Sequence, residues 1–242
     1  MKSIILCAGE GTRLRPITYE CPKCMIRVGD KPLLEYLIIL ARNHGITEIA
    51  INLFHLPDSI TDYFGDGGKF GVNITYSPEE ELLGSAGAVK RLEGFLDETF
   101  VVIYGDLLTD LDLTKMAGFH QKHNAPVTVS LYQVPNPEEC GLVETTDNDR
   151  IVRFVEKPDP DDVFTDWANA GVYIIEPEII KYIPNTHPYD FGSDLFPKLL
   201  NEDVPLYGYR ISEELIDIGS PYKLEKANRM FKEKRFDFDN TR

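Results

Sequence analysis

Short apolar runs alternate with helical segments along the first half of the chain, and this order restricts the fold more than any other feature of the sequence. Runs of strand length occupy residues 3–6, 48–53, 72–76 and 100–104. Segments with apolar residues at helical spacing or with helical composition follow them at residues 32–43, 57–64, 85–92 and 112–123. This alternation is typical of an α/β sheet in which helices join parallel strands.

The second half of the chain has a different pattern. Strands are predicted at residues 127–133, 141–145, 151–156 and 172–175, and a closing helix at 222–234. Turns join the first three of these strands, and Asp147-Asn148-Asp149 indicates a β-hairpin. We therefore predict one Rossmann-like α/β domain over residues 1–242, with a mixed, mainly parallel central sheet flanked by helices and a small additional β-hairpin region. Because no hexapeptide repeat occurs, no C-terminal β-helix is expected.

Charge and apolar content exclude several classes of partner. The chain carries 40 acidic and 25 basic residues, a formal net charge of -15. The electrostatic field of this negative charge repels nucleic acids and anionic membranes, so neither is expected as a partner. An anionic substrate must therefore bind to a local group of cations. No stretch approaches the roughly 18 apolar residues of a membrane span, and a signal peptide is not evident, so a cytoplasmic location is expected. The four cysteines, too few for a disulfide scaffold, are expected to be reduced.

A glycine turn follows the first apolar run and carries several cations. Gly9 and Gly11 lack a Cβ and can adopt backbone angles closed to other residues, so consecutive amides can point into one anionic pocket. Arg13, Arg15 and Lys23 add full positive charges nearby. The P-loop string is absent, and the dinucleotide fingerprint fails because its third glycine is replaced by leucine. We interpret the turn as a triphosphate cradle.

The string Gly9-x-Gly11-Thr12-Arg13-Leu14-x-Pro16-x-Thr18, with Pro22-Lys23-x-Met25 after it, resembles the N-terminal signature of the sugar-1-phosphate nucleotidyltransferases, in pattern closest to the mannose-1-phosphate guanylyltransferases. Cys24 departs from the proline or alanine that is common there. The resemblance implies an enzyme that joins an NTP and a sugar 1-phosphate with Mg²⁺ as cofactor and releases pyrophosphate. It implies catalytic roles for Arg13, Lys23 and Asp106, and nucleotide contacts from Leu6, Ala8, Gly9, Gly11, Thr12 and Arg13.

A second glycine-containing segment is a candidate binding site for the base of the nucleotide. Leu83-Gly84-Ser85-Ala86-Gly87 begins a predicted helix, where small residues would let a base and ribose pack on the backbone, although a tightly packed helix start explains them as well. The segment resembles the family's base-pocket sequence, which implies nucleotide contacts from Gly84, Ala86 and Gly87. The carboxylate of Glu81 suits the two donors of guanine. GTP and mannose 1-phosphate are the favoured substrates, with glucose-1-phosphate thymidylyl- or uridylyltransferase and heptose-1-phosphate guanylyltransferase as alternatives.

Two aspartates are candidate magnesium ligands. Asp106 follows the apolar run at 100–104, at the strand edge where open α/β sheets bind ligands. An aspartate after a strand is often only a turn former. Asp217 lies in Asp217-x-Gly219-x-Pro221, which resembles a motif of the same family. The resemblance implies that Asp217 binds the metal ion together with Asp106. Hard carboxylate oxygens suit Mg²⁺, which keeps phosphate oxygens and water as its other ligands.

The sugar 1-phosphate is assigned to a third group of residues. Glu156 and Lys157 end a predicted strand, and they would be an exposed edge pair if no ligand bound there. The resemblance implies that Glu156 binds sugar hydroxyls and that Lys157 neutralises the sugar phosphate. It implies further sugar contacts from Gly141, Asn169 and Gly171.

Three further interpretations concern the rest of the chain. A non-catalytic subunit that binds a nucleotide sugar and regulates a partner is an alternative of another class. Cys21-x-x-Cys24 has the spacing of a redox or zinc motif, without a second pair at ligand spacing. His120 and His123 are predicted on a solvated helix face. The sequence leaves a homo-oligomer open.

Overall fold

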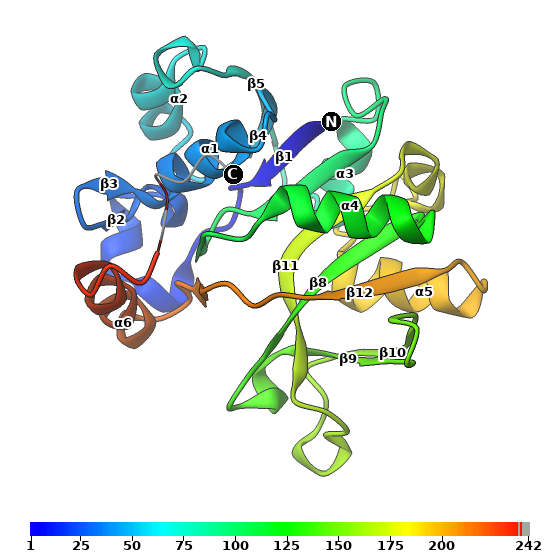
Figure 1. Ribbon diagram of the computed structural model, residues 1–242. Coiled ribbons are helices and arrows are strands. Elements are labelled where there is room, and N and C mark those ends of the chain that lie inside the picture. Colours follow the sequence, from blue (N-terminus) through cyan, green and yellow to red (C-terminus); the bar gives the residue numbers. More distant parts are fainter. Residues whose placement is uncertain (237, 239–242) are drawn as a thin grey trace. The chain divides into compact units, whose positions relative to one another are not determined.

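The computed structural model describes residues 1–236 and 238, and in it the chain forms two compact units (Figure 1). The first unit contains residues Met1–Leu82, Ile103–Leu113 and the chain from Glu213 onward. The second contains Leu83–Val102 and Thr114–Ser212. The chain therefore crosses from one unit to the other four times. A single catalytic domain over residues 1–242 stays a prediction.

Three parallel strands of the main sheet lie at the centre of the first unit. Strand β4 (Glu48–Leu53) pairs with β1 (Lys2–Leu6) on one side and with β5 (Asn73–Pro78) on the other. Ile4, Ile5 and Ile51 are fully buried, as expected of parallel strands covered on both faces. Helices α1 (Leu33–Asn43) and α2 (Asp58–Phe64) belong to the same unit, and α1 directs a continuous apolar face inward.

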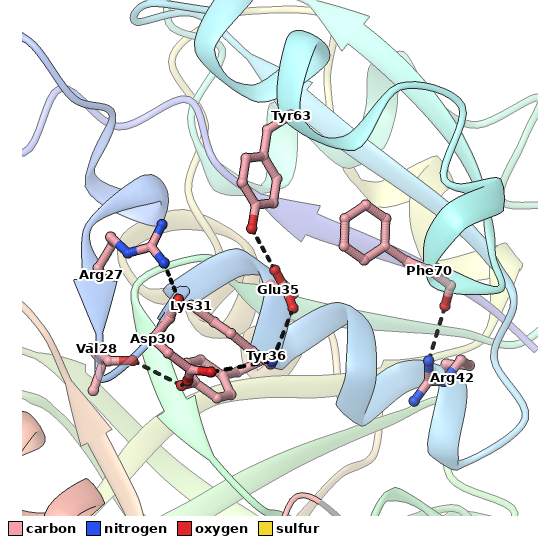
Figure 2. Close-up of polar contacts among 9 residues, drawn as sticks. All are labelled: Arg27, Val28, Asp30, Lys31, Glu35, Tyr36, Arg42, Tyr63 and Phe70. Atoms are coloured by element: carbon pink, nitrogen blue, oxygen red, sulfur yellow. Dashed lines mark hydrogen bonds and ion pairs between the residues drawn. The ribbon is translucent and has the colours of Figure 1, made fainter.

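A small hairpin, β2 (Arg27–Val28) with β3 (Lys31–Pro32), is tied to α1 by side-chain contacts. Figure 2 shows Tyr36 of α1 donating from its hydroxyl to the Val28 carbonyl, at 2.8 Å. In the same view Tyr63 of α2 donates to Glu35 of α1 at 2.8 Å. The first bond satisfies the hydroxyl of a buried tyrosine. Both bonds fix segments that follow the cation loop, the glycine turn with Arg13, Arg15 and Lys23.

Strands β7 (Leu107–Thr109) and β13 (Leu215–Asp217) form an antiparallel pair in the first unit, and helix α6 (Pro221–Lys232) follows. Ala227 and Met230 of α6 are buried in a core cluster with Tyr36. Gly29 has φ +62°, and a Cβ there would overlap the Phe231 ring of α6. The hairpin can therefore approach α6 only because residue 29 is glycine.

A mixed sheet is the centre of the second unit. Its strands are ordered β10 (Ile151–Glu156), β9 (Gly141–Thr145), β11 (Trp167–Ile175), β8 (Val127–Gln133) and β12 (Leu206–Arg210). Only the β8–β12 pair is parallel. Helices α3 (Ser85–Arg91) and α5 (Phe196–Asn201) belong to this unit, as does all but the first residue of α4 (Leu113–His123). Four aromatic rings pack together in its core: Phe154, Tyr173, Phe191 and Phe196.

Short helical segments connect several of these elements. Segments of 3-10 helix occupy Thr12–Leu14, Ile17–Tyr19, Lys23–Met25, Gly68–Phe70, Pro137–Glu139, Pro160–Asp162 and Pro177–Tyr182. A π-helical turn, Phe191–Leu195, precedes α5. Among the described residues, no helix is long and apolar enough to cross a membrane.

The predicted α/β class, with helices beside a sheet of mixed pairing and an additional hairpin, is confirmed. Five predicted strands have the predicted bounds: β4, β6 (Phe100–Tyr104), β8, β9 and β10. The sequence patterns missed β2, β3, β7, β12, β13 and α5. The part of the chain that the structure describes contains no β-helix.

Candidate active site

The glycine turn after β1 has a backbone that only glycine fits at one position. Gly11 has φ +63°, and a Cβ there would lie 2.9 Å from Cγ2 of Thr18. The Thr18 hydroxyl donates to the Gly11 carbonyl at 2.9 Å, and Nε2 of His55 lies 2.7 Å from the Thr18 carbonyl oxygen. These contacts hold the loop closed on itself. Arg13, on the 3-10 turn that follows, is exposed.

Space beside Gly9 is open, because a Cβ there would meet no atom within 4 Å. Unlike Gly11, Gly9 has no steric reason within the protein to be glycine. Close approach of a ligand to the bare backbone is one reason to have glycine at such a position. The exposed backbone of Gly9 therefore agrees with the interpretation of the loop as an anion cradle.

Buried polar residues support the end of β1. The Cys7 amide donates to Oδ1 of Asn52 at 2.7 Å, and the Asn52 amide donates to Oε1 of Glu79 at 2.8 Å. Asn52 and Glu79 are only 3% and 8% exposed. This chain of bonds connects the ends of β1, β4 and β5. Asn52 was not among the predicted site residues, although a polar residue within an apolar strand is a signal in the sequence.

Asp106 and Asp217 lie next to each other although they are far apart in the sequence. Asp217 is the last residue of β13 and stands opposite Leu107 in the antiparallel register. The Ile218 amide donates to the Asp106 carbonyl at 2.8 Å. The pairing of β7 with β13 therefore brings both predicted metal ligands to one place in the first unit.

Lysines pair with both carboxylates. Nζ of Lys23 donates to Oδ2 of Asp106 and lies 3.6 Å from Oδ1 of Asp217. Nζ of Lys223 donates to Oδ2 of Asp217 at 2.9 Å. The Lys23 side chain is 14% exposed, and the two carboxylate side chains 27% and 26%. Oδ1 of Asp217 is buried and accepts no hydrogen bond.

Burial and the lysines shift the pKa values of the two carboxyl groups in opposite directions. Burial raises the pKa of Asp106, and the opposing effect of Lys23 does not fully offset it. Burial also acts to raise the pKa of Asp217, but Lys23 and Lys223 outweigh it, so that pKa is lowered. Asp217 is therefore firmly ionised at neutral pH.

This arrangement fits a hard divalent cation that is shared with a substrate. Two neighbouring carboxylates, one with an unsatisfied buried oxygen, are the kind of donors that Mg²⁺ prefers. No three His, Cys, Asp or Glu side chains among residues 1–236 and 238 are grouped to hold a metal ion. A cation held here would take its other ligands from phosphate and water. Asp106 and Asp217 are the residues that would hold it.

Glu156 is the centre of the candidate sugar site in the second unit. A Cβ on Gly141 or Gly192 would lie 2.5 or 2.6 Å from its Oε2, so both glycines make room for the carboxylate. Partial burial raises the pKa of Glu156, against the effect of Lys157 and with a further contribution from Asp190. Nζ of Lys157 lies 3.9 Å from Oε1 of Glu156, and the lysine side chain is 67% exposed.

The start of α3 is held by the chain itself. The amides of Ala86 and Gly87 donate to the Tyr189 carbonyl, at 3.0 Å each, and Ser85 donates from its amide and hydroxyl to Asp190 at 2.8 Å. Gly84 has φ +79°, and a Cβ there would lie 2.5 Å from the Tyr189 carbonyl oxygen. The glycine thus has a packing reason of its own. Contact of Gly84, Ala86 and Gly87 with a nucleotide stays a prediction.

Asn169 is held in one orientation by two bonds. Its amide donates to the Tyr173 hydroxyl at 2.8 Å, and its Oδ1 accepts from the Gly171 amide at 3.0 Å. Gly171 has φ +77° within a register shift of β11. Glu81, the residue assigned to guanine, is exposed after β5. The roles of Asn169, Gly171 and Glu81 stay predictions.

The first unit thus brings Arg13, Lys23, Asp106 and Asp217 together, since Nη2 of Arg13 would lie 3.1 Å from a Cβ on Gly219, beside Asp217. The second unit brings Gly141 and Lys157 to Glu156. Sequence reasoning missed Lys223, Asp190 and Gly192. Apart from the position of Lys223 shortly after Asp217, nothing in the sequence pointed to them.

Comparison with known proteins shows which family the chain resembles. A family model described as nucleotidyl transferase matches residues 2–234. The chain is 44% identical over 233 residues to a Synechocystis protein named UTP–glucose-1-phosphate uridylyltransferase, covering 90% of this chain and 60% of that protein. It is 35% identical over 221 residues to a Mycobacterium tuberculosis mannose-1-phosphate guanylyltransferase, covering 90% and 61%. The chain therefore spans about three fifths of the length of these relatives.

Solved structures are similar along the whole chain. A Bacillus anthracis protein described as a candidate glucose-1-phosphate thymidylyltransferase, solved with sucrose, superposes with a TM-score of 0.88 at 26% identity. The match covers 100% of this chain and 98% of that one.

Proposed function

The chain belongs to the nucleotidyl transferase family, and from this premise we propose that it transfers the nucleotidyl group of an NTP to a sugar 1-phosphate, giving a nucleotide sugar and pyrophosphate. The observation that carries the proposal is the cluster of Arg13, Lys23, Asp106 and Asp217, in the same unit as the open backbone of Gly9. Cations here can meet a triphosphate although the chain as a whole is strongly acidic.

The reaction needs no activated side-chain nucleophile. A phosphate oxygen of the sugar 1-phosphate is already anionic and attacks the α-phosphorus of the NTP in line, and pyrophosphate leaves. Arg13 stabilises the leaving pyrophosphate, and Lys23 neutralises phosphate oxygens close to the reacting centre. Asp106 and Asp217 would hold Mg²⁺, which would neutralise further phosphate charge.

Residues of the second unit serve the sugar 1-phosphate in this proposal. The Glu156 carboxylate accepts hydrogen bonds from sugar hydroxyls, supported by its fixed position against Gly141 and Gly192. Lys157, which is largely exposed, neutralises the sugar phosphate. Asn169 and Gly171 contact the sugar. The proposed substrates are thus small anions. We also propose that the protein is located in the cytoplasm.

Two substrate pairs are candidates, and they rest on different observations. GTP with mannose 1-phosphate rests on Glu81, whose exposed carboxylate can accept from both donors of guanine. UTP with glucose 1-phosphate rests on the 44% identity to a protein named as a uridylyltransferase. Glu81 does not suit uracil, which places one donor between two carbonyl acceptors.

A substrate panel tests the proposal. The protein is incubated with Mg²⁺, each of GTP, UTP, dTTP, CTP and ATP, and glucose, mannose or heptose 1-phosphate, while pyrophosphate release is measured. We expect release with at least one pair, and GTP with mannose 1-phosphate or UTP with glucose 1-phosphate should be fastest. Binding of a nucleotide sugar without release from any pair would instead support the regulatory subunit.

A further inference from the structure

Lys223 contacts the candidate metal site, and no sequence motif assigns it a role. It lies in the first turn of α6, where its amide donates to the hydroxyl of Ser220 at 3.3 Å. Its Nζ donates to Oδ2 of Asp217 at 2.9 Å, while Lys23 lies 3.6 Å from Oδ1 of the same carboxylate. Each oxygen of Asp217 thus faces a lysine.

The formal charges of the cluster oppose the binding of a lone cation. Arg13, Lys23 and Lys223 carry three positive charges, and Asp106 and Asp217 carry two negative ones. A divalent cation must compete with a lysine for each carboxylate and makes the site more positive. A triphosphate brings several negative charges and reverses this balance.

We propose that Lys223 is a positioning residue that acts as an internal counter-ion of Asp217 and keeps divalent cations from binding tightly until a triphosphate is present. The proposal rests on the metal-binding role given to Asp106 and Asp217 in the proposed function. The Ser220 cap and the first turn of α6 fix the backbone of Lys223, so its ammonium group stays within reach of Asp217.

This role gives Lys223 a different function from Lys23. Lys23 lies in the loop that is assigned to the nucleotide, and it is bonded to Asp106. Lys223 comes from a helix outside that loop, and among the described residues its ammonium group contacts Asp217 alone. Removal of Lys223 therefore changes the charge around the carboxylates and leaves the cation loop complete.

Binding of Mn²⁺ to the nucleotide-free protein tests the proposal without measuring activity. Free Mn²⁺ is followed by electron paramagnetic resonance during titration of the wild type, Lys223→Met, Lys223→Arg and Lys226→Met. Lys223→Met should bind Mn²⁺ about tenfold more tightly, because one positive charge close to the ion is lost. Lys223→Arg keeps the charge and should remain within about twofold of the wild type.

Lys226→Met is the matched control. Lys226 lies on the same helix, is exposed, and makes no hydrogen bond or ion pair within the described part of the chain. Its loss changes the net charge equally but should leave Mn²⁺ affinity unchanged. Equal affinities for the wild type and Lys223→Met, including no detectable binding by either, overturn the proposal.

An Asp217→Asn variant separates this proposal from the proposed function. If Asp217→Asn abolishes the binding seen in Lys223→Met when the two changes are combined, the ion binds at the assigned carboxylates. If the combined variant binds as well as Lys223→Met, the metal assignment is itself wrong. If Asp217→Asn weakens binding while Lys223→Met has no effect, only the role of Lys223 fails. Thermal unfolding of each variant checks that it is folded.

Discussion

At the scale of single residues, the two carboxyl groups of the candidate metal site are not equivalent. The carboxylate of Asp106 pairs with one lysine, Lys23, and burial raises the pKa of Asp106. Asp217 faces two lysines, and its pKa is lowered. Loss of Asp106 therefore removes a charge whose burial is unfavourable, whereas loss of Asp217 leaves Lys223 without its acceptor. Functional sites often contain such unfavourable charges.

Asp106→Asn should lower turnover by about 100-fold to 1000-fold, the usual cost of one electrostatic contact at a reacting centre. The fold should remain, because asparagine has the same shape and Lys23 still lies 3.6 Å from Asp217. Pyrophosphate release measures turnover, and circular dichroism with thermal unfolding measures the fold. A folded variant with nearly wild-type turnover would contradict the metal assignment.

Glu156→Gln should stabilise the protein at pH 8. The pKa of Glu156 is raised by partial burial and by Asp190, so ionising it costs more in the folded than in the unfolded chain. This cost is present above the folded pKa and disappears as the pH falls to the unfolded pKa. The gain in melting temperature should therefore shrink between pH 8 and pH 4. Glu139→Gln, at an exposed site, is the control, and its melting temperature should not change with pH in this way. An equal gain for Glu156→Gln at pH 8 and pH 4 would contradict a raised pKa of Glu156.

Glu81→Gln tests the guanine assignment. A carboxylate accepts both donors of guanine, whereas an amide offers one acceptor and a donor, so kcat/KM for GTP should fall by about tenfold or more. The value for UTP should not fall. Glu80→Gln, at the exposed neighbouring position, is the control. An equal loss for both nucleotides would remove Glu81 from base recognition.

At the scale of secondary-structure elements, the sequence predicts best where a local pattern decides the outcome. β4, β6 and β8 are apolar runs of strand length, and their predicted bounds agree with the structure. β7 and β13 have three residues each and exist because they pair across the chain, which no local pattern reveals.

In the candidate site, too, residues in a local sequence pattern could be predicted, and residues that depend on tertiary contacts could not. The cation loop could be predicted because its residues are consecutive, whereas Asp190 acts on Ser85, 105 residues away in the sequence. Lys223 reaches Asp217 because α6 begins shortly after β13. The prediction of a solvated face for His120 was wrong. Its side chain is buried and lies 2.8 Å from the Thr128 hydroxyl and 3.0 Å from Glu176. Helical spacing of two histidines could not reveal these tertiary partners.

Gly84→Ala tests the packing at the start of α3. The new Cβ would lie 2.5 Å from a backbone oxygen at a φ of +79°, so we expect a loss of about 2 to 4 kcal/mol in the free energy of unfolding. Gly118→Ala, within α4 and with no atom within 4 Å of its Cβ, should instead stabilise by about 0.5 to 1 kcal/mol. Denaturant unfolding measures both, and similar effects in the two variants would contradict the packing argument.

At the scale of the whole molecule, the question is whether the two units unfold together. The chain crosses between them four times, so each unit depends on segments from separate parts of the sequence. Cooperative unfolding is expected when segments of one unit are covalently continuous with the other at several points.

A nucleotide should therefore stabilise the entire chain in one transition. At a concentration 100 times its Kd, the preferred NTP should raise the free energy of unfolding by about 2.7 kcal/mol. Calorimetry should show a single endotherm that moves to higher temperature with NTP and Mg²⁺. Two endotherms, only one of which moves, would contradict the prediction of a single domain over residues 1–242.

The pairing of β7 with β13 has a consequence for biosynthesis. The ribosome completes the cation loop and Asp106 early, but Asp217 is made only after most of the chain. A nascent chain shorter than 217 residues has one carboxylate of the pair and no strand β13 to bring the second beside it. Under the proposed function, a chain released before Asp217 is made therefore lacks half of the metal site and should not consume NTP.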